Sequence, residues 1–142
     1  MAGCDTADLV GKWELVRHEN SEALFAAIGV PEELRQKMAA IKNTMDIQEQ
    51  DGDWVITETT FPGQPDRVQK FRLGQEEELP TLFGKRKCIV TLEGGKLMNR
   101  SANPEEPIEF VGCREVINGE LVVKAILPKK DVVGTAYYAK IG

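Results

Sequence analysis

The chain has 142 residues, of which 42% are hydrophobic and 29% are charged, which fits a single globular domain spanning residues 1–142. Its net charge of −5 provides no basic excess for a phosphate backbone, so we expect no nucleic-acid partner. The single histidine, His18, leaves most histidine-dependent catalysis and metal binding without side chains to perform it. Most histidine-dependent enzymes are therefore excluded, and we expect no metal site and no cofactor.

The cysteines and the N-terminus indicate a cellular compartment. Cys4, Cys88 and Cys113 make an odd number without C-x-x-C spacing, which is typical of free thiols in a reducing environment. The N-terminal residues lack the basic segment and hydrophobic run of a secretory signal. We therefore expect a cytoplasmic protein.

The chain opens with a predicted strand over residues 11–18 and continues into a segment of helical periodicity. Apolar residues recur at helical spacing between about residues 21 and 41, and Gly29 followed by Pro31 divides them into two groups. Pro31 suits the first position of a second helix, since its missing N–H is not needed there. This segment is predicted to form a helix–turn–helix.

The remainder of the chain contains the turn dipeptides that are typical of antiparallel hairpins. Asp51-Gly52, Gly94-Gly95 and Asn118-Gly119 each separate two runs rich in β-branched and apolar residues. Together with the first strand, these β-branched and apolar runs predict about nine or ten strands. We interpret the acidic segment at residues 76–78 as a solvated loop. The predicted strands after the helical segment cover residues 45–50, 54–61, 67–73, 87–92, 96–101, 108–117, 121–127 and 132–141.

So many consecutive antiparallel strands favour a closed sheet. An open sheet would expose the hydrogen-bonding groups of two edge strands, and closure into a barrel removes them. We predict an all-β barrel capped by the helical segment. A barrel of about eight or more strands has room for a small ligand as well as for side chains.

Arg114 lies on the more apolar of the two faces of the strand predicted at residues 108–117. A guanidinium that faces a barrel interior requires a carboxylate or hydrogen-bonding partners. Tyr138, on the last strand, offers a phenol to the same anion, and such donors beside apolar walls suit a fatty carboxylate. The opposite register, with Arg114 in solvent, fits the mixed pattern equally well.

Several segments, in order, resemble the intracellular lipid-binding proteins, the family of the fatty-acid-binding and cellular retinoid-binding proteins. The likeness covers nearly the whole chain and is closest to the fatty-acid-binding proteins. It rests on the segments Leu9-Val10-Gly11-Lys12-Trp13, Ala27-Ile28-Gly29-Val30, Phe71-Arg72-Leu73-Gly74, Ile89-Val90-Thr91-Leu92-Glu93-Gly94-Gly95-Lys96-Leu97 and Asn118-Gly119-Glu120-Leu121-Val122-Val123.

The resemblance implies a ten-stranded antiparallel up-and-down β-barrel of the lipocalin-like (calycin) class, with a helix–turn–helix lid and no catalytic activity. It implies that Arg114 binds the ligand carboxylate. It also matches Tyr138 to the tyrosine of an Arg-x-Tyr pair on the last strand, whose arginine is replaced here by Ala136.

These inferences predict a monomeric carrier that binds a long-chain fatty acid or a similar hydrophobic carboxylate and makes transient contact with membranes. Two alternatives stay open: a retinoid carrier of the same family, and an interaction protein whose cavity binds nothing because Arg114 is satisfied internally. The predicted ligand-binding residues are Arg114 and Tyr138 at the head group, with Leu24, Phe25, Met38, Phe61, Val123 and Ala125 around the tail.

Overall fold

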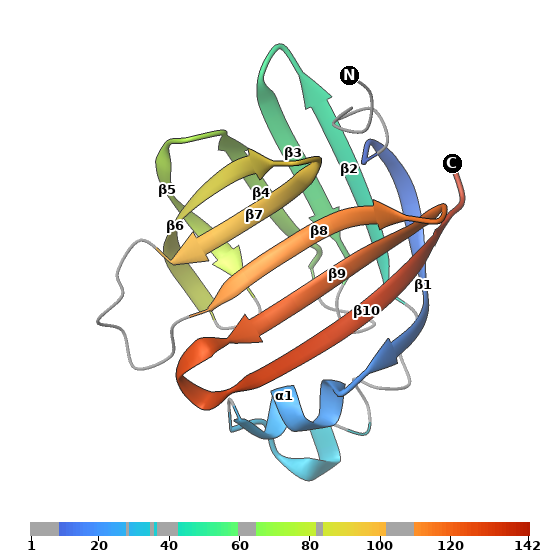
Figure 1. Ribbon diagram of the computed structural model, residues 1–142, viewed down its shortest axis with the longest axis vertical. Helices are drawn as coiled ribbons and strands as arrows, with labels where there is room; N and C mark the ends of the chain where they lie inside the picture. The colour runs from blue at the N-terminus through green and yellow to red at the C-terminus, as the bar shows by residue number, and fades with distance from the viewer. Residues whose placement is uncertain are drawn as a thin grey trace.

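The computed structural model describes residues 9–27, 29–34, 36, 43–59, 65–81, 84–101 and 110–142. These residues form ten strands, the helix α1 and a short 3-10 helix, η2, and residues 32–34 and 36 are also helical (Figure 1). The elements are β1 (Gly11–Glu19), α1 (Ser21–Ala27), β2 (Thr44–Gln50), β3 (Asp53–Glu58), β4 (Arg67–Arg72), β5 (Glu76–Thr81), β6 (Gly84–Glu93), β7 (Lys96–Ser101), β8 (Val111–Ile117), β9 (Glu120–Leu127), η2 (Pro128–Lys130) and β10 (Val132–Lys140).

The strands form one antiparallel sheet in the order β4-β3-β2-β1-β10-β9-β8-β7-β6-β5, and the sheet curls so that β4 and β5 approach each other (Figure 1). At that seam, side chains partly replace the ladder of backbone hydrogen bonds. Gln69 Nε2 donates to the Pro80 carbonyl at 2.6 Å, and the Arg72 amide donates to Glu77 Oε2 at 2.7 Å. The predicted all-β barrel of ten strands is confirmed, in a nearly closed form.

The three predicted hairpin turns are confirmed. Asp51 and Gly52 have φ angles of 53° and 86°, and both residues of Gly94-Gly95 and Asn118-Gly119 also lie in the left-handed region. This geometry matches the twist of the strands that the turns connect, which is why Gly, Asn and Asp are favoured there.

The prediction of a solvated loop at residues 76–78 is wrong, because these residues begin β5. Glu76 and Glu78 point to solvent, while Leu79 faces the interior and is almost fully buried. Since β5 is an edge strand paired only with β6, it tolerates a polar outer face and has little hydrophobic alternation. Boundaries also shift elsewhere, since β6 begins at Gly84 rather than residue 87 and β3 ends at Glu58 rather than residue 61.

Helix α1 covers one end of the barrel beside the start of β10 (Figure 1). Asn20 donates from Nδ2 to the Val133 carbonyl at 2.8 Å, which fixes the entry into the helix. Leu24 then packs on Gly134, where an added Cβ would lie 2.9 Å from Leu24 Cδ2. Gly29, at φ 85°, follows the helix and donates its N–H to the Ala26 carbonyl.

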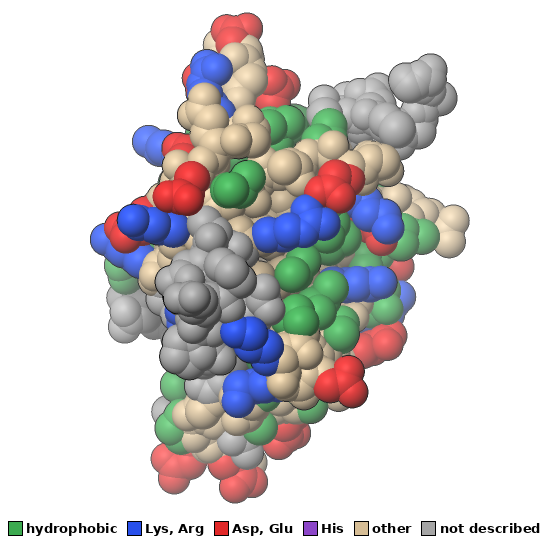
Figure 2. Space-filling model, turned by 60° about the vertical axis from the view of Figure 1, so that its left-hand side comes forward, with side chains coloured by type: hydrophobic (Ala, Val, Ile, Leu, Met, Phe, Trp, Pro, Cys, Tyr) green, Lys and Arg blue, Asp and Glu red, His purple; other side chains and the backbone are tan. Residues whose placement is uncertain are grey.

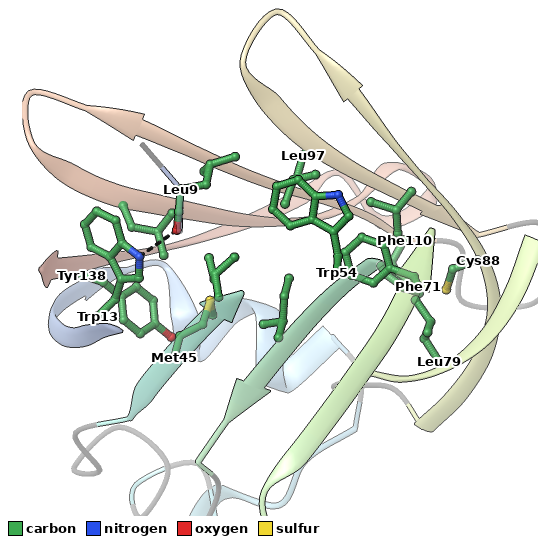
Figure 3. Close-up of a cluster of buried hydrophobic side chains, with 14 of the residues drawn as sticks. Leu9, Trp13, Met45, Trp54, Phe71, Leu79, Cys88, Leu97, Phe110 and Tyr138 are labelled. Atoms are coloured by element: carbon green, nitrogen blue, oxygen red, sulfur yellow. Dashed lines mark hydrogen bonds between the residues drawn. The ribbon is translucent and has the colours of Figure 1, made fainter. Parts of the chain in front are cut away.

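A packed aromatic and aliphatic core fills the barrel end away from α1. Trp13 lies near the start of β1, and its Nε1 donates to the Leu9 carbonyl at 3.0 Å (Figure 3). Trp54, beside the β2–β3 turn, stacks on Phe71 with ring centroids 6.3 Å apart. Because both tryptophans are almost fully buried, this end of the barrel is closed by packing.

Candidate ligand-binding site

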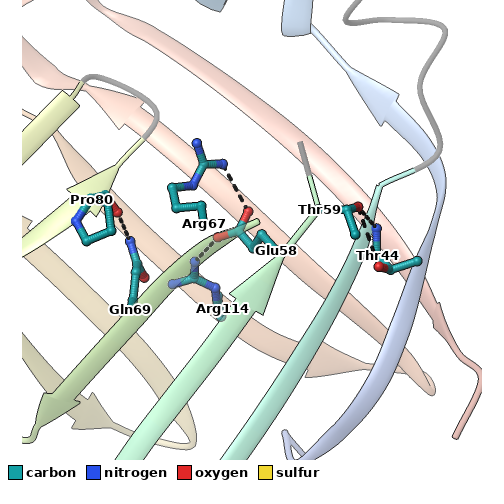
Figure 4. A network of polar contacts seen from close by, with 7 residues as sticks. All are labelled: Thr44, Glu58, Thr59, Arg67, Gln69, Pro80 and Arg114. Atoms are coloured by element: carbon teal, nitrogen blue, oxygen red, sulfur yellow. Dashed lines mark hydrogen bonds and ion pairs between the residues drawn. The ribbon is translucent and has the colours of Figure 1, made fainter. Parts of the chain in front are cut away.

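Arg114 faces the interior of the barrel and is only 9% exposed. On β8 it lies in register with Leu97 of β7 and Val123 of β9, both of which point inward. Its Nη2 donates to Glu58 Oε1 at 3.0 Å (Figure 4). Since Glu58 lies on β3, which is not a neighbour of β8 in the sheet, this ion pair crosses the interior.

A second arginine meets the same carboxylate. Arg67 of β4 donates from Nη2 to Glu58 Oε2 at 3.3 Å, so each Glu58 oxygen accepts from a different guanidinium (Figure 4). The side chains of Arg114, Glu58 and Arg67 are 10%, 13% and 22% exposed. Buried charges need such pairing, because removing an unpaired ion from water costs several kcal/mol by order of magnitude.

Tyr138 lies inside the same barrel, on β10, and is almost fully buried. Burial raises the pKa of its phenol above the ordinary value, and the negative charge of Glu58 acts in the same direction, while Arg114 and Arg67 oppose it. The phenol therefore stays neutral and able to donate a hydrogen bond at physiological pH. We call Glu58, Arg67, Arg114 and Tyr138 the polar cluster.

Some polar atoms of the interior lack a hydrogen-bond partner within the described part of the chain. They are Arg114 Nε, Gln69 Oε1 and Asn99 Oδ1. Gln69 on β4 and Asn99 on β7 are each nearly fully buried. Because buried polar groups in folded proteins are usually satisfied by protein, water or ligand, these atoms mark an interior built for polar contacts.

The apolar residues predicted to line the site are placed as follows. Val123 and Ala125 face inward from β9 but remain partly exposed, as does Ala136 opposite Val123 on β10. Inward side chains that keep accessible surface show that the barrel is not packed solid at this level. Leu24 and Phe25 approach the core from α1, whereas Met38 and Phe61 lie outside the described residues.

The sequence reasoning missed Glu58, Arg67, Gln69 and Asn99. A local signal for the first three exists in strand alternation. Glu58 has the same phase as the core residue Trp54, and Arg67 and Gln69 have the same phase as Phe71. The reasoning that placed Arg114 on an apolar face therefore applies equally to β3 and β4.

The outer surface carries charges of both signs. Figure 2 shows Lys, Arg, Asp and Glu side chains interspersed on one face, with hydrophobic side chains between them. Several of these charges are paired across neighbouring strands, as in Arg72 with Asp53 and Arg100 with Glu93. Among the described residues, no helix is long and apolar enough to span a membrane.

A nearly closed barrel with a helical cap and a polar cluster inside defines the class of proteins that hold a small molecule internally. The model of the Lipocalin / cytosolic fatty-acid binding protein family matches residues 7–126. The chain belongs to this family. Since the family consists of binding proteins, the prediction that the chain is not an enzyme is confirmed.

Curated relatives agree with this membership. The chain is 39% identical over 109 residues to a liver-type fatty acid-binding protein of Epinephelus coioides, a match that covers 76% of this chain and 84% of the relative. It is 33% identical over 121 residues to fatty acid binding protein 1-A, liver, of Danio rerio, covering 84% and 92%.

Solved structures share the whole fold. A REP1-NXSQ fatty acid transporter superposes with a TM-score of 0.83 at 27% identity, covering 96% of this chain and 98% of the other. A zebrafish ileal bile acid-binding protein in complex with cholic acid gives 0.79 at 27% identity, covering 94% and 99%. The fluorescent protein UnaG gives 0.80 at 29% identity, covering 96% and 100%.

Proposed function

We propose that the protein is an intracellular carrier that binds a long-chain fatty acid or a similar hydrophobic carboxylate inside the barrel, for solubilisation and transport. The observation that carries this proposal is the inward Arg114, a buried guanidinium whose Nε has no partner among the described residues. Relatives named as fatty acid-binding proteins support it.

In this proposal, Arg114 and Tyr138 bind the carboxylate. A guanidinium suits a carboxylate because its N–H groups match the two oxygens in spacing and charge. The neutral phenol of Tyr138 adds a further donor. Since both groups are already held by the barrel, little ordering of the protein is required when the head group arrives.

The apolar residues contact the tail. Each methylene removed from water contributes about 0.8 kcal/mol, less the cost of ordering the chain. The tail is proposed to contact Leu24, Phe25, Val123 and Ala125 of the described residues.

Ligand exchange is proposed to require local opening near α1. The helix is attached through Leu24 on Gly134 and through the bond from Asn20 to the Val133 carbonyl. Local opening of one short element costs less than global unfolding.

Lys129 and Lys130 of η2 are proposed to make transient contact with anionic membranes, since η2 directly precedes β10, the strand that α1 contacts. The carrier is proposed to be a cytoplasmic monomer.

A second candidate is an interaction protein with a non-binding interior. The pairing of Arg114 with Glu58 favours it, because the guanidinium has an internal counterion without any ligand. In that case the cavity would be a relic of the family fold.

Mass spectrometry of lipids extracted from the natively purified protein separates the two candidates. The carrier yields a stoichiometric hydrophobic acid, and after delipidation it binds a fluorescent fatty acid that oleate displaces. Absence of any stoichiometric lipid, together with no binding of the fluorescent acid, contradicts the carrier and supports the second candidate. Retinoic acid and retinol, added as competitors, test for a retinoid carrier.

A further inference from the structure

We propose that Arg67 is the second cation of the head-group site and that Glu58 limits the site to one ligand carboxylate. This inference rests on the proposed carrier function and adds the residues that set its ligand class. Ala136, the inward-facing position before Tyr138 on β10, brings no charge to the polar cluster. Arg67 reaches the same cluster from β4.

The net charge of the polar cluster favours a ligand with one carboxylate. Arg67 and Arg114 carry two positive charges and Glu58 carries one negative charge, which leaves +1 in a largely buried setting. Tyr138 contributes no charge, since burial keeps its phenol protonated. One ligand carboxylate brings the sum to zero, whereas an alcohol leaves it at +1 and a second carboxylate at the same place takes it to −1.

The polar cluster has more hydrogen-bond donors than Glu58 uses. Glu58 uses one N–H-bearing nitrogen of each arginine, Nη2 in both cases. Arg114 Nε is buried and has no acceptor within the described residues. The cluster therefore has a charged donor left over for a second acceptor beside Glu58, so the incoming carboxylate joins Glu58 rather than replacing it.

A ligand carboxylate beside Glu58 places two carboxylates in one site. Like charges a few ångströms apart raise the pKa of one partner unless each has its own counter-charge. With Arg67 and Arg114 both present, each carboxylate has a guanidinium. Without Arg67, Glu58 and the ligand share Arg114, so the ligand binds more weakly.

The protein contains a matched control on the same two strands. Glu58 and Arg67 form a cross-strand pair at one end of β3 and β4, and Asp53 and Arg72 form another at the opposite end. The second pair is exposed, with side chains 51% exposed for Arg72 and 61% for Asp53. Both pairs link the strands, but only the first faces the interior.

The test measures displacement of a fluorescent fatty acid by oleate and by oleyl alcohol. Arg67→Gln is expected to weaken oleate binding by about tenfold or more, the effect of losing one nearby opposite charge, and to leave oleyl alcohol unchanged. Glu58→Gln is expected to strengthen oleate binding and to admit a lipid that carries two ionised carboxylates on neighbouring carbons at one end, such as an alkenylsuccinate. The double variant has the wild-type net charge and should regain oleate affinity near that of the wild type. Arg72→Gln should match the wild type throughout.

Different failures have different meanings. If the wild type binds no oleate, the carrier function and this inference are both overturned. If the wild type binds oleate and Arg114→Gln loses it, but Arg67→Gln binds as well as Arg72→Gln, only this inference is overturned. An equal loss for oleate and oleyl alcohol in Arg67→Gln, while Arg67→Lys restores neither, shows that Arg67 merely supports the barrel.

Discussion

Arg114 and Glu58 are 56 positions apart in the chain, and their side chains meet at 3.0 Å across the interior of the barrel. Strand β3, which carries Glu58, does not pair with strand β8, which carries Arg114, so the contact exists only because the sheet curls. An ion pair of this kind places a polar centre where a solid barrel would have an apolar core. It also makes the stability of the fold and the chemistry of the interior depend on the same residues.

Removal of Glu58 should therefore destabilise the ligand-free protein. In Glu58→Ala both guanidiniums lose their shared acceptor, and the free energy of unfolding is expected to fall by about 2–4 kcal/mol. Asp53→Ala breaks the exposed pair on the same strands and should cost less than about 1 kcal/mol. Urea unfolding of both variants measures the difference. Equal losses would mean that the interior pair is no more important than a surface pair.

Gly134 should control how α1 sits on the barrel. A Cβ at this position would lie 2.9 Å from Leu24 Cδ2 and 3.1 Å from Leu24 Cβ, so Gly134→Ala forces the helix outward. We expect a loss of about 1–3 kcal/mol in stability and faster release of a bound fluorescent fatty acid. Stopped-flow release measures the second effect. A Gly134→Ala variant with the stability and the release rate of the wild type would contradict this packing.

Glu93 on the outer surface should give a stability contribution that depends on pH. Its hydrogen bonds from Arg100 and Thr91 lower the pKa of the carboxyl from 4.5 to about 2. Because the pKa is lower in the folded protein, the stabilisation is complete above pH 4.5 and is lost as the pH falls towards 2. The difference in urea midpoint between wild type and Glu93→Gln should shrink over that range. A difference that stays constant from pH 6 to 2 would contradict the pairing.

The thiols of Cys88 and Cys113 should be unreactive in the native protein. Burial raises the pKa of Cys88 to about 11 and raises that of Cys113 above its ordinary value. Since the thiolate is the reactive form, iodoacetamide at pH 8 should label the native protein at no more than one of its three cysteines, because two are protected. Labelling in urea should reach all three. Rapid modification of Cys88 in the native protein would show that the core opens readily.

The fold was predictable because its signals are local. Turn dipeptides and the alternation of apolar and polar residues can each be recognised within a few residues of sequence. Only the polar edge strand β5 lacked such a signal. The direction of Arg114 was not predictable, because each face of β8 carries apolar residues and one buried residue. Cys113, on the outer face, lies between Met98 and Lys124 and is only 6% exposed. The pairing with Glu58 and Arg67 depends on closure of the sheet, which brings together residues that no local pattern connects.

Calorimetric titration of oleate into the delipidated wild type, Arg114→Ala and Arg100→Ala measures whether an interior arginine holds a ligand carboxylate. Arg100 is the appropriate control because it lies on the outer surface, paired with Glu93. We predict one oleate per chain for the wild type, unchanged affinity for Arg100→Ala, and a loss of about tenfold or more for Arg114→Ala. Equal affinities for the three proteins, or no binding to the wild type, would contradict an interior carboxylate site at Arg114.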